Sequence, residues 1–160
     1  MIREVGIRGN DNHIFILVIL FIKFNNDKHK FCFSMESFVF KGRNFEVNFD
    51  NKAQKCSGID KSDNKGFKLV FFSFPYSSIL KITHFQVDEE KRKKGLGRFV
   101  LSKFEEWAKN ENFKQIIGDI TKNKDYSNPK DVVKFYKKSE YEISLKDKGM
   151  IFAEISKNLV

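Results

Sequence analysis

The sequence predicts an α/β protein whose mixed, mostly antiparallel sheet is flanked by helices and whose N-terminal half is rich in strands. Three observations carry this prediction. Apolar residues, most of them Phe, recur at every second position within residues 31–35, 38–40 and 45–49, as half-buried strands require. The spacing changes to that of an amphipathic helix from Leu96 onward. Strand-like and helix-like segments then alternate to residue 155, which is typical of an α/β arrangement.

The first apolar segment runs from Ile14 to Ile22, after a polar lead-in of residues 1–13. Its nine residues fall well short of the roughly 20 that a membrane-spanning helix needs. Two arginines ahead of it resemble the start of a signal peptide, but Asp11 interrupts the approach and no small-residue cleavage site follows. A run of this kind is typical of a strand buried on both faces, and the expected compartment is the cytoplasm.

A meander of antiparallel strands is expected next, with turns at residues 25–27 and 41–44. The alternating apolar positions of these strands are Phe31, Phe33, Met35, Phe38, Phe40, Phe45, Val47 and Phe49. Residues 50–66 are rich in Asn, Asp, Lys and Ser, and this composition predicts a loop. Two further strands are predicted over residues 67–74 and 79–87.

The C-terminal half is predicted to hold two helices between strands. Apolar residues at helical spacing run from Leu96 to Ala108. Pro129 suits the first turn of a second helix, with Ser127 or Asn128 as its N-cap. The remaining strands are predicted at residues 113–120, 141–145 and 150–155. No repeat and no long linker interrupts the chain, so residues 1–160 are expected to form a single domain.

Charge and composition argue against several classes of function. The 160 residues carry 30 Lys and Arg against 21 Asp and Glu, a formal net charge of +9. The excess is spread evenly, with 12 basic and 8 acidic residues in 1–78 and 18 and 13 in 79–160. A polyanion-binding protein more often concentrates its charge on one element. The two cysteines lack metal-ligand spacing and the three histidines are scattered, so neither a disulfide scaffold nor a metal site is expected.

One local cluster of charge stands out, the basic run Lys91–Lys94 ahead of Gly95 and Gly97. It lies between a strand end and an amphipathic helix. Backbone N–H groups at a helix start are unpaired and the macrodipole is positive there, so this segment suits a phosphate. Four cations at this end of a helix make sense beside a bound anion. The spacing is not that of a Walker P-loop, and Val100 stands where the third Gly of a dinucleotide fingerprint belongs.

The motif Arg92-x-x-Gly95-x-Gly97, after a strand that ends Phe85-Gln-Val87, resembles the acyl-CoA motif of the GNAT superfamily of N-acetyltransferases. That motif reads Gln/Arg-x-x-Gly-x-Gly/Ala. Downstream, the segment from Asn128 to Tyr141 resembles the second family signature, an Asn followed by a Phe/Leu-Tyr pair and a closing Gly-Phe. The resemblance covers residues 79–155, and the order of elements agrees with the family.

The resemblance implies a GNAT-like fold and an acetyl-CoA-dependent N-acetyltransferase. The backbone amides of residues 92–97 would hold the coenzyme pyrophosphate, and the strand edge at residues 85–87 would pair with the pantetheine arm. Tyr136 would be the general acid that protonates the departing thiolate; without the resemblance, a Tyr at this helical position would be assigned to the core. Residues 79–160 would form the acyl-CoA-binding half and residues 1–78 a divergent acceptor-side half. The implied coenzyme-binding residues are Phe85, Val87, Arg92, Lys93, Lys94, Gly95, Leu96, Gly97, Arg98 and Asn128.

The sequence departs from the family pattern at several positions. Asn128 lies one residue further from the tyrosine than is usual, and Glu140-Tyr141 replaces the closing Gly-Phe. Lys81 stands where the family often has a catalytic Glu. His84 has the opposite strand parity and is expected to point away from the site. Asp119, on the next strand, is the remaining candidate for the general base.

Three functions are therefore weighed. The first is transfer of an acetyl group from acetyl-CoA to a primary amine by direct attack, with no metal. The second is a catalytically silent CoA-binding GNAT-like scaffold or sensor, which the missing base favours. The third is a small basic nucleic-acid-binding protein that uses Lys91–Lys94 against phosphates. The acceptor amine is not specified by the sequence, no membrane partner is expected, and an exposed edge of the meander would permit a homodimer through sheet extension.

Overall fold

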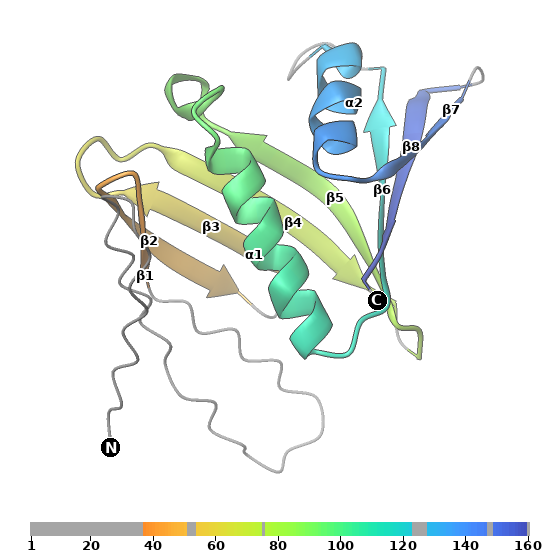
Figure 1. Cartoon of the computed structure of the whole chain (residues 1–160), viewed down its shortest axis with the longest axis horizontal. Helices are drawn as coiled ribbons and strands as arrows, with labels where there is room; N and C mark the ends of the chain where they lie inside the picture. Colours follow the sequence, from red (N-terminus) through yellow and green to blue (C-terminus); the bar gives the residue numbers. More distant parts are fainter. Residues whose placement is uncertain (1–36, 51–53, 75, 123–127, 147–148, 160) are drawn as a thin grey trace, which may run out of the picture.

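The computed structural model describes residues 37–50, 54–74, 76–122, 128–146 and 149–159. Its strands form one sheet in the order β1-β2-β3-β4-β5-β6-β8-β7 (Figure 1). All neighbouring strands in this sheet are antiparallel except β5 and β6, which are parallel. The prediction of a mixed, mostly antiparallel sheet is confirmed. The elements are β1 Ser37–Phe40, β2 Arg43–Asp50, β3 Lys55–Asp60, β4 Gly66–Ser73, β5 Ile79–Val87, the 3₁₀ helix η1 Glu89–Lys91, α1 Leu96–Asn110, β6 Gln115–Thr121, α2 Pro129–Lys138, β7 Glu142–Leu145 and β8 Ile151–Asn158.

The described part of the N-terminal half is a phenylalanine-rich meander, as the alternation predicts. Phe45 and Val47 of β2 are buried against α1, and the Phe38 ring of β1 stacks on Phe45 with 5.0 Å between ring centroids. The predicted strand Ile14–Ile22 and the apolar positions 31, 33 and 35 lie outside the described residues.

The prediction of a loop over residues 50–66 is wrong, because β3 occupies the middle of that segment. The face of β3 turned toward α1 carries Cys56, Gly58 and Asp60 in place of large apolar side chains. Gly58 is required there, since a Cβ at this position would overlap the Phe67 ring of the neighbouring strand. Asp60 is buried because cations far along the sequence neutralise it. The strand therefore lacks the apolar alternation that would reveal it.

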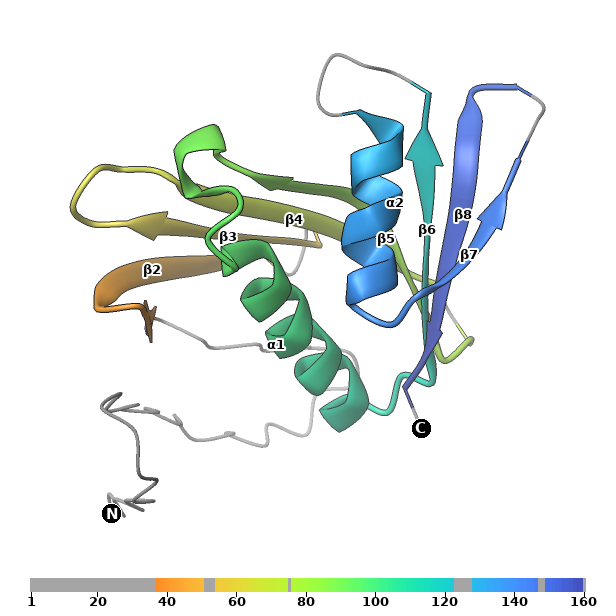
Figure 2. The same ribbon diagram turned by 45° about the horizontal axis from the view of Figure 1, so that its top comes forward.

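Both helices pack on the same face of the sheet (Figure 2). The apolar stripe of α1 predicted from its spacing is buried, with Leu101 and Ala108 fully inaccessible. Helix α2 begins at Pro129 with Asn128 as its N-cap, as predicted. The core lies between the helices and the sheet, and burying each of its leucines contributes about 1.5–3 kcal/mol. Among the described residues, no helix is both long and apolar enough to cross a bilayer.

Candidate functional site

The centre of the candidate site is a fork between β5 and β6. The two parallel strands pair only from Ile79 with Gln115 to Ile82 with Gly118. Beyond these pairs β5 continues to Val87 and β6 to Thr121, and the strands diverge away from their shared end near the C-terminus (Figure 1). No described strand lies between them. The facing strand edges are thus available to an extended ligand.

A β-bulge changes the orientation of side chains along β5. Its register with β4 shifts so that Val70 pairs with His84 and Phe71 with Ile82, which leaves Thr83 as an extra residue. Ile82 and Phe85 therefore both face the helices, while Lys81 and His84 both face the opposite side of the sheet. The expectation that His84 has the opposite orientation to Lys81 is wrong, because simple alternation does not survive a bulge.

The backbone of β5 presents hydrogen-bonding groups to the fork. Asp88 N–H donates to the Gly66 carbonyl at 2.9 Å, so Asp88 belongs to a hydrogen-bonded pair with β4. Antiparallel ladders alternate, and the N–H and C=O groups of Phe85 and Val87 accordingly point away from β4, toward the fork. The Val87 carbonyl accepts a hydrogen bond from Arg92 Nε at 2.8 Å. The backbone groups of Phe85 and Val87, on the predicted edge, therefore face the fork.

The start of α1 presents a row of bare amides beside the fork. Lys93 and Gly95 have left-handed backbones, with φ of +59° and +92°, and Gly95 is the N-cap without a side-chain capping bond. The N–H groups of residues 93–98 have no hydrogen-bond acceptor among the described residues. Amides that converge at a helix N-terminus attract anions, because the helix dipole is positive there.

The basic run ahead of these amides is divided between two roles. Lys93 and Lys94 are exposed, and so is Arg98 in the first turn of α1. Lys91 is buried, and its Nζ lies 2.6 Å from an oxygen of Asp60 and 2.6 Å from an oxygen of Asp63. The expectation that all four cations of the run face a ligand is therefore wrong for Lys91. Local sequence carries no signal for this, because the partner carboxylates lie far away in the chain, at the end of β3 and in the turn that follows it.

Gly97 marks the place where α1, α2 and β5 meet. A Cβ on Gly97 would lie 3.3 Å from Phe135 Cε2, which is tight, and 3.5 Å from Val87 Cγ2, an ordinary van der Waals distance. The Phe85 and Phe135 rings pack with 5.9 Å between centroids. Leu96 is buried, so Leu96 and Gly97 can offer a ligand only their backbone. The side chains of Phe85 and Val87 likewise serve packing.

Tyr136, the predicted general acid, lies in the core under α2. Its ring packs edge-on against Phe135 and Tyr141, with centroid separations of 5.1 and 5.2 Å. Its hydroxyl makes no hydrogen bond to a described residue, and burial raises the pKa of Tyr136 well above its usual range. The phenol is therefore protonated at neutral pH, as a general acid must be before it acts.

Asp119, the predicted base, lies at the opening of the fork but on the other face of the sheet. It follows Gly118, the last residue of β6 that pairs with β5. Its carboxylate forms an ion pair with Lys81 across the two strands, with 2.6 Å between Oδ2 and Nζ. The two predicted catalytic groups thus lie on opposite faces of the sheet. Asn128, predicted to bind the coenzyme, accepts a hydrogen bond from Lys130 N–H at 3.0 Å as the cap of α2.

Neither a protein-family model nor a curated protein sequence matches this chain. Solved structures do match it. A GNAT-family acetyltransferase from Listeria monocytogenes superposes with a TM-score of 0.56 at 10% identity, over 76% of this chain and 99% of that one. Nourseothricin acetyltransferase gives 0.55 at 11% identity, over 72% of this chain and 84% of that one. Ard1 from Thermoplasma volcanium gives 0.52 at 18% identity, over 67% and 71%. The chain therefore has the fold of the GNAT N-acetyltransferases.

Proposed function

We propose that this protein is an acyl-CoA-dependent N-acyltransferase that transfers the acetyl group of acetyl-CoA to a primary amine. One juxtaposition carries the proposal: the uncapped start of α1 lies directly beside the unpaired edge of β5 at the fork. A long ligand with phosphates at one end and an amide-containing arm at the other matches both features. The fold, shared with acetyltransferases, supports the same assignment.

In this proposal the coenzyme pyrophosphate binds the amides of residues 93–98, and Lys93, Lys94 and Arg98 supply positive charge around it. The pantetheine arm lies along β5 and bonds to the backbone of Phe85 and Val87. The Arg92 side chain, which now bonds to the Val87 carbonyl, must share or release that acceptor when the arm binds. Asn128, at the cap of α2, remains a predicted contact.

The reaction needs one bond made and one broken. The amine nitrogen attacks the thioester carbonyl, a C–N bond forms, and the C–S bond breaks. Backbone N–H groups at the β5 edge polarise the carbonyl as charge develops on its oxygen. The amine proton leaves to Asp119 or to water, and the departing thiolate takes a proton from Tyr136. Holding both reactants in the fork supplies the proximity that this direct attack requires.

The second candidate is a CoA-binding scaffold without turnover, and two observations favour it. Asp119 is held in an ion pair with Lys81, which competes with its use as a base. Burial raises the pKa of Tyr136 well above that of a thiol, so proton transfer to the thiolate is uphill unless the bound ligand brings polar groups to the hydroxyl. Binding without turnover would follow from these features.

The first experiment is a thermal-shift titration of the full chain with acetyl-CoA, CoA and ATP. We expect both CoA species to raise the melting temperature more than ATP does, because ATP lacks the pantetheine arm. Absence of a shift with either CoA species, under conditions where a known CoA-binding protein responds, would remove the proposal. Steeply salt-dependent binding to nucleic acid in its place would support the third function considered above.

Turnover is then measured as free thiol released from acetyl-CoA with a panel of primary amines. If Tyr136 is the general acid, Tyr136→Phe should lower kcat by about 10²-fold or more while the KM for acetyl-CoA stays near the wild-type value. CoA binding without thiol release from any amine would establish the scaffold. Unchanged kcat in the variant would return Tyr136 to a purely structural role.

A further inference from the structure

We infer that Lys91 is a positioning residue, and that an ion-pair network of Arg43, Asp60, Asp63 and Lys91 fixes the start of the coenzyme-binding loop. We call these four residues the hairpin clamp, because Asp60 at the end of β3 and Asp63 in the turn that follows both belong to the β3–β4 hairpin. The inference rests on the proposed function, since it assigns a role to groups that hold the loop but do not touch the coenzyme.

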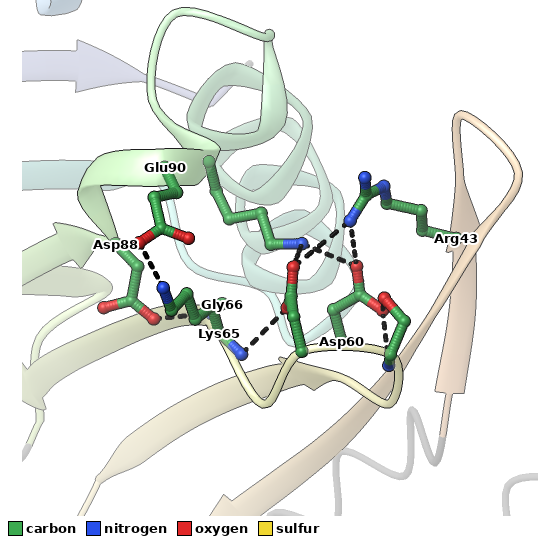
Figure 3. Close-up of polar contacts among 9 residues, drawn as sticks. Arg43, Asp60, Lys65, Gly66, Asp88 and Glu90 are labelled. Atoms are coloured by element: carbon green, nitrogen blue, oxygen red, sulfur yellow. Dashed lines mark hydrogen bonds and ion pairs between the residues drawn. The ribbon is translucent and has the colours of Figure 1, made fainter.

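The charged groups of the clamp lie close together and bond to one another (Figure 3). Lys91 Nζ lies 2.6 Å from Oδ2 of Asp60 and 2.6 Å from Oδ2 of Asp63. An Arg43 guanidinium nitrogen reaches the same two oxygens at 3.1 and 3.2 Å. The other oxygen of Asp60 accepts hydrogen bonds from Ser62 N–H at 2.9 Å and from Ser62 Oγ at 2.7 Å. Two positive and two negative charges cancel, so the clamp adds no net charge to the site.

Further contacts tie η1 to the same hairpin (Figure 3). Asp88, just before η1, accepts a hydrogen bond from Gly66 N–H at 2.6 Å and returns one from its own N–H to the Gly66 carbonyl at 2.9 Å. Lys65 forms an ion pair with Glu90. The segment from Asp88 to Lys91 is therefore attached to the β3–β4 turn at both of its ends.

This attachment matters because the loop that follows has little packing of its own. Residues 92–95 are exposed, and two of them adopt left-handed backbones. Lys91 is the last residue before this loop, and the bare amides begin two residues later at Lys93. Buried ion pairs are costly to form and add little stability over apolar replacements, so their effect here is best sought in geometry. The clamp sets the direction in which the amides point.

Two variants separate positioning from electrostatic attraction. Asp63→Asn removes an ion pair of the clamp and makes the region more positive, so simple attraction of phosphate would strengthen binding. If the clamp instead positions the loop, Asp63→Asn should weaken binding. Lys91→Met removes the cation that pairs with Asp60 and Asp63. Lys61→Met is the matched control for Lys91→Met: it removes a lysine from the same hairpin, with the same change of net charge. Lys61 is exposed, and among the described residues its side chain pairs only with Glu46.

The experiment is isothermal titration of each full-length protein with CoA, well below its melting temperature, together with hydrogen exchange of the unliganded loop. We expect Asp63→Asn and Lys91→Met to weaken CoA binding by about 10- to 100-fold, and the amides of residues 92–97 to exchange faster. Lys61→Met should bind within about twofold of wild type. If Lys91→Met does not fold, Asp63→Asn carries the test, because Asp63 is partly exposed.

Unchanged or tighter binding by Asp63→Asn would overturn the inference, as would equal weakening by Lys61→Met. Failure of the wild-type protein to bind CoA would instead contradict the proposed function. In that case hydrogen exchange still tests whether the clamp orders the loop. Faster exchange of the loop amides in Asp63→Asn, but not in Lys61→Met, would support this role. Equal exchange in the two variants would reject it.

Discussion

Asp60 shows at the scale of one residue how the fold makes a buried carboxylate acceptable. It is 1% exposed, yet it lies between Lys91 and Arg43 and accepts two bonds from Ser62. The hydrogen bond from Lys91, helped by those from Ser62, holds the pKa of Asp60 well below its usual range. For Lys91, burial alone would lower the pKa, but the bonds to Asp60 and Asp63 outweigh it and raise the pKa.

This arrangement predicts acid sensitivity. A carboxyl with a depressed pKa in the folded state stabilises the protein above the unfolded-state pKa of about 3.9, and that contribution is lost as the pH falls below this value. Asp60→Asn should therefore lower the melting temperature at pH 7 and flatten its fall between pH 5 and pH 2.5. Circular dichroism melts across this range measure both effects.

Asp131 provides the control, because it lies on the exposed face of α2 in a surface ion pair with Lys134. Asp131→Asn should keep the wild-type dependence of melting temperature on pH, since exposed pairs contribute little. A melting curve for Asp60→Asn that falls with acid as steeply as the wild-type curve would contradict the assignment of this sensitivity to the clamp.

At the scale of an element, the β3–β4 hairpin connects the meander to the loop of residues 92–95, which we propose binds the coenzyme. Its strands approach closely at Gly66, which pairs with Ile59, the residue after Gly58. A Cβ on Gly66 would overlap the carbonyl group of Gly58, and neither backbone can move without breaking strand pairing. Gly66 also exchanges two hydrogen bonds with Asp88. The hairpin is therefore hydrogen-bonded directly to the residue that precedes η1.

We expect Gly66→Ala to destabilise the protein by about 1–3 kcal/mol, the usual cost of forcing an extra methyl group into a packed site. Urea unfolding followed by circular dichroism measures this loss. Gly42→Asn is the control, because a Cβ at this turn glycine meets nothing within 4 Å and Asn tolerates its positive φ. Equal loss in the two variants would show that close strand approach is not the cause.

Elements with apolar periodicity could be predicted from the sequence, because the spacing of apolar residues within the segment itself reveals a helix or a half-buried strand. The stripe of α1 and the Pro129 start of α2 are examples. Strand β3 could not be predicted in this way, since its inward face carries Cys56, Gly58 and Asp60 in place of large apolar side chains. The same limit applies to the site: spacing predicts the glycine loop, whereas the partners of a buried lysine lie about thirty residues away in the chain.

At the scale of the whole molecule, the sheet of the described residues consists of two wings that meet at the fork. Strands β1–β5 form one wing and β6, β8 and β7 the other. Four residue pairs join them, from Ile79 with Gln115 to Ile82 with Gly118, and the shared core lies under the two helices. Gly118 is packed tightly at this junction, since a Cβ there would lie 3.0 Å from the Ile82 carbonyl oxygen. A ligand in the fork would contact both wings and stabilise them together.

Linkage gives the size of this effect. A ligand at about 100 times its Kd stabilises the folded state by about 2.7 kcal/mol. For a chain of this length that corresponds to a rise in melting temperature of roughly 5–10 °C.

Hydrogen exchange then reports where the stabilisation acts. CoA should slow exchange of the loop amides 93–98 and of Phe85 and Val87 on β5, and also of Asp119–Thr121 on β6. ATP, which has phosphates but no pantetheine arm, should protect the loop alone. Protection by CoA confined to the loop would mean that the arm does not enter the fork, and the proposed site of acyl transfer would then be wrong.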